Sequence, residues 1–266
     1  MTRRPNPGEW TQLSSAFPGL IWNDVWITGE PTAQYNCIGY SMGLFQWINP
    51  RSPLAAFDQQ YAQQGFVQAP STSATIDGWG KNGGTEMTHG SRQSTTMPQT
   101  ALWESKLGQS FRITHGRNQL VSTIYGSVLT YFRPKAGMPG EPEGGSMGRY
   151  TADEYTKIAD EAARVNPGLK AAFEERLAIW KATWARPELA MSQSTYDRAR
   201  GPEFEAVVGL GDGIAPLVAE GIATRPDGIF LVPLLEEYTT PVRPESPTEG
   251  EQARGQRAVR AWLATR

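Results

Sequence analysis

A Gly- and Pro-rich stretch at residues 135–148 separates two parts of the chain whose hydrophobic patterns differ. The stretch reads KAGMPGEPEGGSMG and has no hydrophobic period, which is typical of a linker or mobile loop. Most Trp residues precede it, whereas charged side chains are denser after it. We therefore predict a first domain at 1–135, a linker at 136–150 and a second domain at 151–266.

The first part combines helical and strand-like patterns. The spacing of apolar residues predicts a helix that begins near Cys37 and a second helix over Pro53–Gly65. Three short runs separated by Gly- and Ser/Thr-rich turns predict an antiparallel meander, and residues 120–132 fit either a strand or a helix. These three runs are Ala74–Trp79, Glu86–Gln93 and Thr100–Ser105.

The second part has helical patterns throughout. Thr151 and Glu154 form a capping-box signature, and apolar residues from Leu169 to Trp184 recur at intervals of three and four. Residues 239–254 are rich in Pro and Glu, and we expect an extended tail segment there. Shorter helices are predicted at 203–210, 214–222, 228–237 and 256–264. The predicted fold class is α+β, followed by an all-α domain.

Composition excludes several classes of protein and site. Lys and Arg number 25 against 27 Asp and Glu, so a net charge of −2 gives no basic field for nucleic acid. One Cys and two His exclude a disulfide framework and the usual structural zinc sites, and we expect neither metal nor cofactor. No run of 18 apolar residues suggests a membrane helix, and the N-terminal basic pair has no apolar run behind it. We therefore expect a cytoplasmic protein.

Cys37 and His89 are the first candidates for chemistry. A lone cysteine is most often a small buried hydrophobe, and a histidine in a strand is often bonded only to backbone. Cys37, however, follows Asn36, a good N-cap residue, and a helix N-terminus lowers a thiol pKa and can receive an oxyanion. His89 is the usual type of partner that removes a thiol proton.

A third group must orient the imidazole of the histidine. Glu104 and Ser105 lie in the next predicted strand, and side-chain alternation decides which of them faces the cleft. His115 could also orient His89, bind substrate or cap a turn. A helix headed by Cys, then a strand with His, then a strand with a polar residue is the order of papain-like hydrolases. The candidate substrate-binding residues are Tyr35, Asn36, Trp79 and Trp103.

The first part of the chain contains five distinctive blocks, Tyr35–Gly43, Thr88–Gln93, Leu102–Gly108, Ile113–His115 and Tyr125–Gly126. Together they resemble a family of uncharacterised bacterial proteins whose layout is similar to papain-like cysteine hydrolases of the NlpC/P60 type. The resemblance covers roughly residues 20–133 and implies a papain-like domain. Gly39 and Gly90 stand where the family has alanine, which is a mild departure, and the tract between Arg92 and Trp103 is longer.

Two kinds of function remain open. The first is a cysteine-dependent hydrolase or acyl transferase, in which Cys37 and His89 act on an amide or ester bond of a peptide-like or acyl substrate. The second is an inactive papain-like binding or structural module. A related alternative is a component of a bacterial conflict system, of the toxin or immunity type, whose helical part binds a protein partner.

Overall fold

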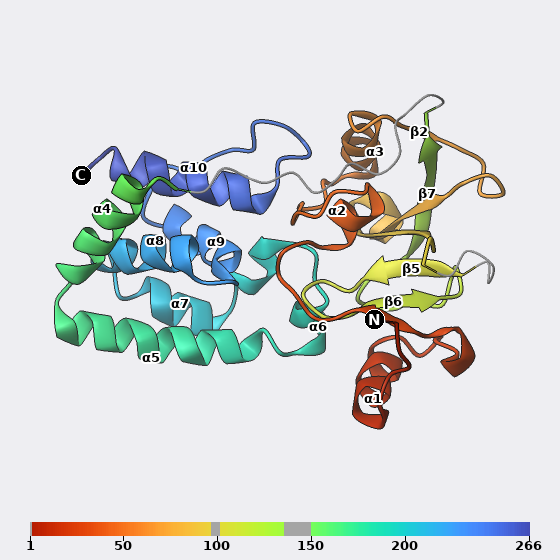
Figure 1. The fold of residues 1–266 in the computed structure, drawn as a ribbon, viewed down its shortest axis with the longest axis horizontal. Coiled ribbons are helices and arrows are strands. Elements are labelled where there is room, and N and C mark those ends of the chain that lie inside the picture. The colour runs from red at the N-terminus through yellow and green to blue at the C-terminus, as the bar shows by residue number, and fades with distance from the viewer. Residues whose placement is uncertain (1, 97–101, 136–149) are drawn as a thin grey trace. The chain divides into compact units, whose positions relative to one another are not determined.

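The computed structural model describes residues 2–96, 102–135 and 150–266 (Figure 1). The chain divides into two compact units. The first comprises residues 1–145 together with 190–194 and 246–248, and the second comprises 146–189, 195–245 and 249–266. Apart from Tyr150, the predicted linker at 136–150 lies outside the described residues.

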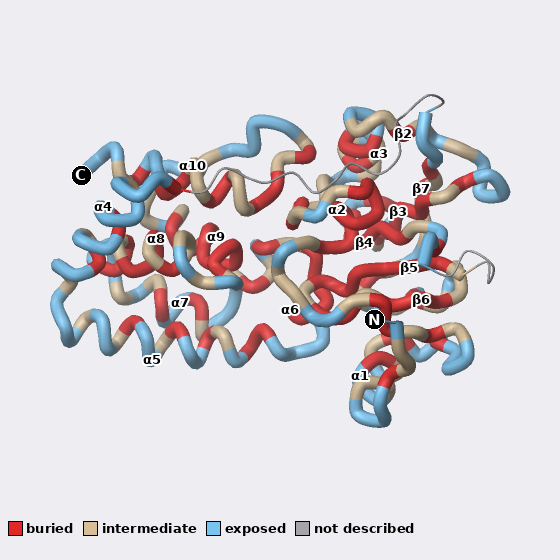
Figure 2. Tube along the Cα trace, viewed as in Figure 1, coloured by how far each residue is buried: buried red, intermediate tan, exposed pale blue. Residues whose placement is uncertain are grey.

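The first unit is built on one antiparallel sheet. Within the described ranges, seven strands form it in the order β1-β6-β5-β4-β3-β7-β2. The central strands β3, β4 and β5 are buried along most of their length (Figure 2). The strands are β1 (Ile27–Gly29), β2 (Phe66–Gln68), β3 (Ile76–Lys81), β4 (Glu86–Gln93), β5 (Trp103–Lys106), β6 (Arg112–His115) and β7 (Ser127–Pro134).

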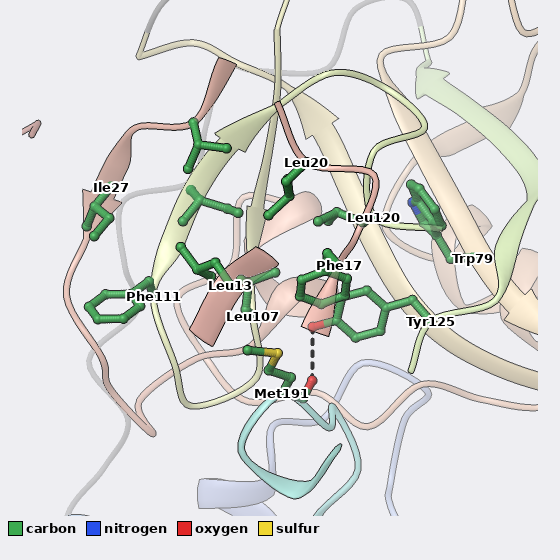
Figure 3. Close-up of a cluster of buried hydrophobic side chains, with 12 residues drawn as sticks. Leu13, Phe17, Leu20, Ile27, Trp79, Leu107, Phe111, Leu120, Tyr125 and Met191 are labelled. Atoms are coloured by element: carbon green, nitrogen blue, oxygen red, sulfur yellow. Dashed lines mark hydrogen bonds between the residues drawn. The ribbon is translucent and has the colours of Figure 1, made fainter. Parts of the chain in front are cut away.

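Side-chain alternation along the strands sends residues into two separate core clusters. Trp79 of β3 joins the cluster that includes Leu13 of α1 (Pro7–Ala16) and Phe17, the residue that follows this helix, as Figure 3 shows. Ile76 of the same strand joins the cluster that includes Phe57 of α3 (Leu54–Ala62) and residues of α2 (Cys37–Ser41). Helix α1 therefore covers one face of the sheet, and α2 and α3 cover the other.

The remaining helices follow the sheet in sequence. The capping box predicted at Thr151 and Glu154 is present at the start of α4, and the Trp180 and Leu177 side chains of α5 are buried as the spacing predicted. These helices are α4 (Ala152–Ala163), α5 (Pro167–Thr183), α6 (Pro187–Ala190), α7 (Pro202–Val208), α8 (Ala215–Thr224), α9 (Val232–Glu236) and α10 (Glu251–Leu263). Short 3₁₀ turns occupy residues 22–24, 82–84, 195–198, 212–214 and 228–231.

Three local expectations need correction. Helix α1 was not predicted, although Asn6 and Glu9 form a complete capping box at its start. Residues 120–126 form turns, so the strand β7 begins only at Ser127. The segment expected to be extended to residue 254 becomes helical at Glu251, because Arg254 is buried there between Glu251 and Glu236.

The mixed α and β content, the antiparallel sheet and the helical second part agree with the predicted fold class. Among the described residues, no single helix has the length and apolar character required to cross a membrane. One bent pair, α7 with residues 212–224, meets that requirement by length and composition alone.

Candidate functional site

Cys37 is the first residue of α2, as the sequence predicted. Asn36 caps the helix, with its Oδ1 accepting the backbone N–H of Gly39 at 3.1 Å. The Sγ of Cys37 accepts the backbone N–H of Gly90 in β4 at 3.3 Å. The thiol therefore lies against the residue that follows His89.

The environment of the thiol opposes its ionisation. Cys37 is fully buried, and burial raises its pKa, an effect that the hydrogen bond from Gly90 only partly offsets. The expectation of a lowered thiol pKa is therefore wrong for this conformation. The physical reason is that the effect of burial outweighs the lowering of the thiol pKa by the backbone amides of Gly90, Ile38 and Cys37.

His89 belongs to a chain of buried hydrogen bonds. Its Nε2 lies 2.9 Å from the Oγ of Ser105 on β5, and the same Oγ lies 2.8 Å from the Nε2 of His115 on β6. The Nδ1 of His115 lies 2.8 Å from the carbonyl oxygen of Gly116. The imidazole of His89 also stacks on the ring of Tyr125 at 3.9 Å between centroids.

The carbonyl of Gly116 determines which atom is the donor in each hydrogen bond from His115 to His89. The carbonyl of Gly116 only accepts, so Nδ1 of His115 carries a proton and Nε2 of the neutral ring is an acceptor. The hydroxyl of Ser105 therefore donates to His115 and accepts from the Nε2–H of His89. This leaves Nδ1 of His89 with a free lone pair. Nδ1 is buried and has no hydrogen-bond partner among the described residues.

Burial keeps both imidazoles neutral near pH 7. It lowers the pKa of His115 to about 4, and the hydrogen bond to Gly116 offsets this only in part. Burial, together with the nearby His115, lowers the pKa of His89 well below its usual value. A neutral His89 can accept a proton at Nδ1, as a general base must.

Cys37 packs in one core cluster of the sheet, and the side chain of His89 contacts the other. The paired positions of β4 and β5 are Arg92 with Glu104 and Gln93 with Trp103, so His89 lies beyond the ladder. The bond from His89 to Ser105 joins the two strands there. Cys37 belongs to the α2–α3 cluster, whereas His89 contacts Trp79 and Tyr125 of the α1 cluster. In the described part of the chain, no hydrogen bond joins Cys37 to His89.

Glu104 does not take part in this chain of hydrogen bonds. Its carboxylate accepts from the hydroxyls of Thr28 and Thr96, and it forms an ion pair with Arg112 at 3.1 Å. Alternation along β5 therefore places Ser105, and not Glu104, next to His89. The proposed role of Glu104 in orienting the imidazole is wrong.

The four candidate substrate-binding residues have other partners. The side-chain amide of Asn36 is occupied by α2, by the backbone of Ile48 and by the carbonyl of Gln193. Trp79 is buried and donates to Ser91, and Trp103 is buried under the guanidinium of Arg117. Tyr35 is half-buried, in contact with Phe45.

Two residues at this site were not predicted from the sequence. Gln193 accepts the backbone N–H of Cys37 at 3.1 Å, and Tyr125 covers the ring of His89. Tyr125 is within one of the family-like blocks, but no spacing rule indicates its contact. Gln193 is 156 residues from Cys37, and no local pattern could identify it. No group of three or more His, Cys, Asp or Glu within the described residues could hold a metal ion.

Cys37, His89, Ser105, His115 and Tyr125 all fall within one segment that matches a protein-family model, whereas Gln193 lies outside it. Residues 26–133 match a domain of unknown function (DUF7689). The match agrees with the expectation of an uncharacterised family over roughly residues 20–133. It gives no support to the papain-like part of that expectation. Searches of curated proteins and of solved structures returned no significant match.

Proposed function

We propose that the sheet-bearing part of this chain is a cysteine-dependent hydrolase or acyl transferase of papain-like design, which acts on an amide or ester bond of a peptide-like substrate. The observation that carries this proposal is the oriented hydrogen-bond chain ending at Nδ1 of His89. Among the described residues this Nδ1 is a buried acceptor without a partner, and His89 precedes Gly90, whose amide donates to Sγ of Cys37. An acceptor without a donor in a protein core is uncommon and calls for an explanation.

The roles follow from the direction of the protons. Sγ of Cys37 attacks the carbonyl carbon while its proton passes to Nδ1 of His89. That proton then goes to the leaving nitrogen or oxygen, and a thioester remains. Water, or an acceptor nucleophile, attacks the thioester, and its proton returns through Nδ1 to Sγ. Ser105 and His115 keep the imidazole in the tautomer that this sequence requires.

The burial of the thiol implies that the site opens before it reacts. Cys37 and His89 are both fully buried in this conformation. The two pKa directions indicate a neutral thiol and a neutral imidazole as the resting forms. The reaction therefore needs a movement that admits the substrate to Sγ.

Thiol modification tests the proposal without a known substrate. We expect a small neutral reagent, methyl methanethiosulfonate, to modify Cys37 at pH 7 at least ten times more slowly in His89→Gln than in the wild type, because the base is lost. Tyr61→Phe, which breaks a buried bond to Ser41 near the thiol, is the matched control and should not slow the reaction. Mass spectrometry gives the rates.

The direction of the effect separates a base from a structural histidine. Removing a purely structural histidine loosens the core and exposes Cys37, so modification becomes faster. Modification of His89→Gln at the wild-type rate or faster would reject the catalytic role.

The alternative is a binding or structural module without activity, and complete burial of Cys37 favours it. A module of this kind predicts that Cys37 reacts only as fast as the protein unfolds. Measuring the modification rate against the free energy of unfolding in urea distinguishes the two functions.

A further inference from the structure

The side-chain carboxamide of Gln193 is held in a single orientation beside Cys37. Its Oε1 accepts the backbone N–H of Cys37 at 3.1 Å, and its Nε2 donates to the hydroxyl of Tyr125 at 3.1 Å and to the carbonyl of Met191 at 2.7 Å. An amide N–H only donates and a carbonyl only accepts, so the positions of oxygen and nitrogen are determined. Gln193 is 2% exposed, which shields these bonds from bulk water.

Tyr125 connects this carboxamide to His89. The phenol donates to the carbonyl of Met191 at 3.0 Å, the bond drawn in Figure 3, so its oxygen is free to accept from Gln193. The phenol ring stacks on the imidazole of His89. The carboxamide therefore lies between the amide of Cys37 and the ring that covers His89, whose Nδ1 has no partner among the described residues.

We propose that the carboxamide socket, defined by the backbone N–H of Cys37 and the hydroxyl of Tyr125, binds the primary carboxamide of a glutamine side chain in a peptide substrate. Gln193 then occupies the socket as an internal stand-in for the substrate. This proposal rests on the proposed function, because it names the bond that Cys37 attacks. A carbonyl oxygen needs the donor that Cys37 supplies, and an NH₂ group needs the acceptor that Tyr125 supplies. An ester or a tertiary amide has no N–H for Tyr125.

The reaction on such a substrate balances without a cofactor. The substrate carboxamide displaces Gln193, and Sγ of Cys37 bonds to its carbon while the thiol proton moves to Nδ1 of His89. The carbon–nitrogen bond breaks, and the proton leaves on nitrogen as ammonia. Water then attacks the thioester and gives one proton to Nδ1 for return to Sγ. The acid that forms releases the second proton to solvent, and the product is the carboxylate of glutamate.

Chemical rescue tests the socket directly. Gln193→Ala deletes a CH₂–CONH₂ group, for which acetamide is a close match. We expect acetamide to raise the thermal midpoint of Gln193→Ala by several degrees more than it raises that of the wild type, and N,N-dimethylacetamide to have no such selective effect. Gln59→Ala, which removes an exposed carboxamide, is the matched control and should behave as the wild type does. Equal effects of the two amides on Gln193→Ala would overturn the proposal.

The experiment stays informative if Gln193→Ala does not fold in buffer. Acetamide present during refolding should then restore native tryptophan fluorescence, whereas N,N-dimethylacetamide should not. Recovery with neither amide, or with both alike, rejects the socket.

A second variant distinguishes this proposal from the proposed function. Cys37→Ala keeps the backbone amide but removes the thiol, so Gln193→Ala combined with Cys37→Ala should show the same selectivity for acetamide. Suppose that acetamide alone rescues the variants, while His89→Gln does not slow modification of Cys37. The carboxamide socket would then be supported and the catalytic role of His89 rejected. Loss of selectivity in both backgrounds rejects the socket alone.

Discussion

The backbone N–H of Gly90 reaches the Sγ of Cys37 because residue 90 has no side chain. A Cβ there would lie 2.4 Å from the hydroxyl of Tyr61 and 2.8 Å from the Oγ of Ser41. At Gly39 a Cβ would lie 2.1 Å from the carbonyl oxygen of Gln46. The expectation that glycine and alanine are nearly equivalent at these two positions is therefore wrong, since both glycines allow α2 its close contacts.

Replacing Gly90 tests this close approach. We expect Gly90→Ala to lower the free energy of unfolding by about 1–3 kcal/mol, because the methyl group overlaps the hydroxyl of Tyr61. Urea unfolding followed by tryptophan fluorescence measures the change. In a Tyr61→Phe background the overlap is smaller, so the cost of Gly90→Ala should fall. An equal cost in both backgrounds would show that the overlap is not its cause.

Removing the hydroxyl of Ser105 leaves two buried imidazole nitrogens without partners. Each unsatisfied buried polar group costs about 1–3 kcal/mol, so Ser105→Ala should destabilise the protein by about 2 kcal/mol or more. Ser105→Thr keeps the hydroxyl and should be much less damaging. Chemical denaturation of both variants is the measurement, and equal stability of Ser105→Ala and the wild type would contradict the chain of hydrogen bonds.

Because the pKa values of His89 and His115 are lowered, we expect the free energy of unfolding to fall in mild acid. Their pKa values are lowered on folding, so below about pH 6.5 the unfolded chain binds protons that the native protein does not. With a native pKa of about 4, His115 alone should reduce the free energy of unfolding by about 2 kcal/mol between pH 7.5 and pH 5.

Thermal unfolding between pH 4 and pH 8 measures this dependence. In His115→Gln, the slope of stability against pH over this window should be shallower than in the wild type. An unchanged slope would mean that His115 titrates normally in the native protein.

Variants of Glu104 test which residue of β5 orients the imidazole of His89. Glu104→Ala leaves the Arg112 guanidinium without its buried partner and should cost about 3 kcal/mol, whereas Glu104→Gln keeps several hydrogen bonds and should cost less. Neither change should alter the tautomer of His89, which ¹⁵N NMR reports directly. A change of the His89 tautomer in Glu104→Gln would show that Glu104 does help to orient this imidazole.

Local signals in the sequence were sufficient where the structure itself is local. Asn36 before Cys37 predicted a helix start, and the cap is present because it involves residues three apart. The same holds for the capping box of Thr151 and Glu154. The pKa of Cys37 was predicted in the wrong direction, because burial by distant segments is not visible in a local pattern.

The sequence by itself determined that any thiol chemistry involves one cysteine and at most two imidazoles, since the chain contains no others. It also predicted that Glu104, Ser105 or His115 orients His89. Only the tertiary structure decided among them, because strand register sets which side chains share a face. It alone brought Gln193 to Cys37, since a hydrogen bond between residues 156 apart depends on the packing of the folded chain and on no local preference.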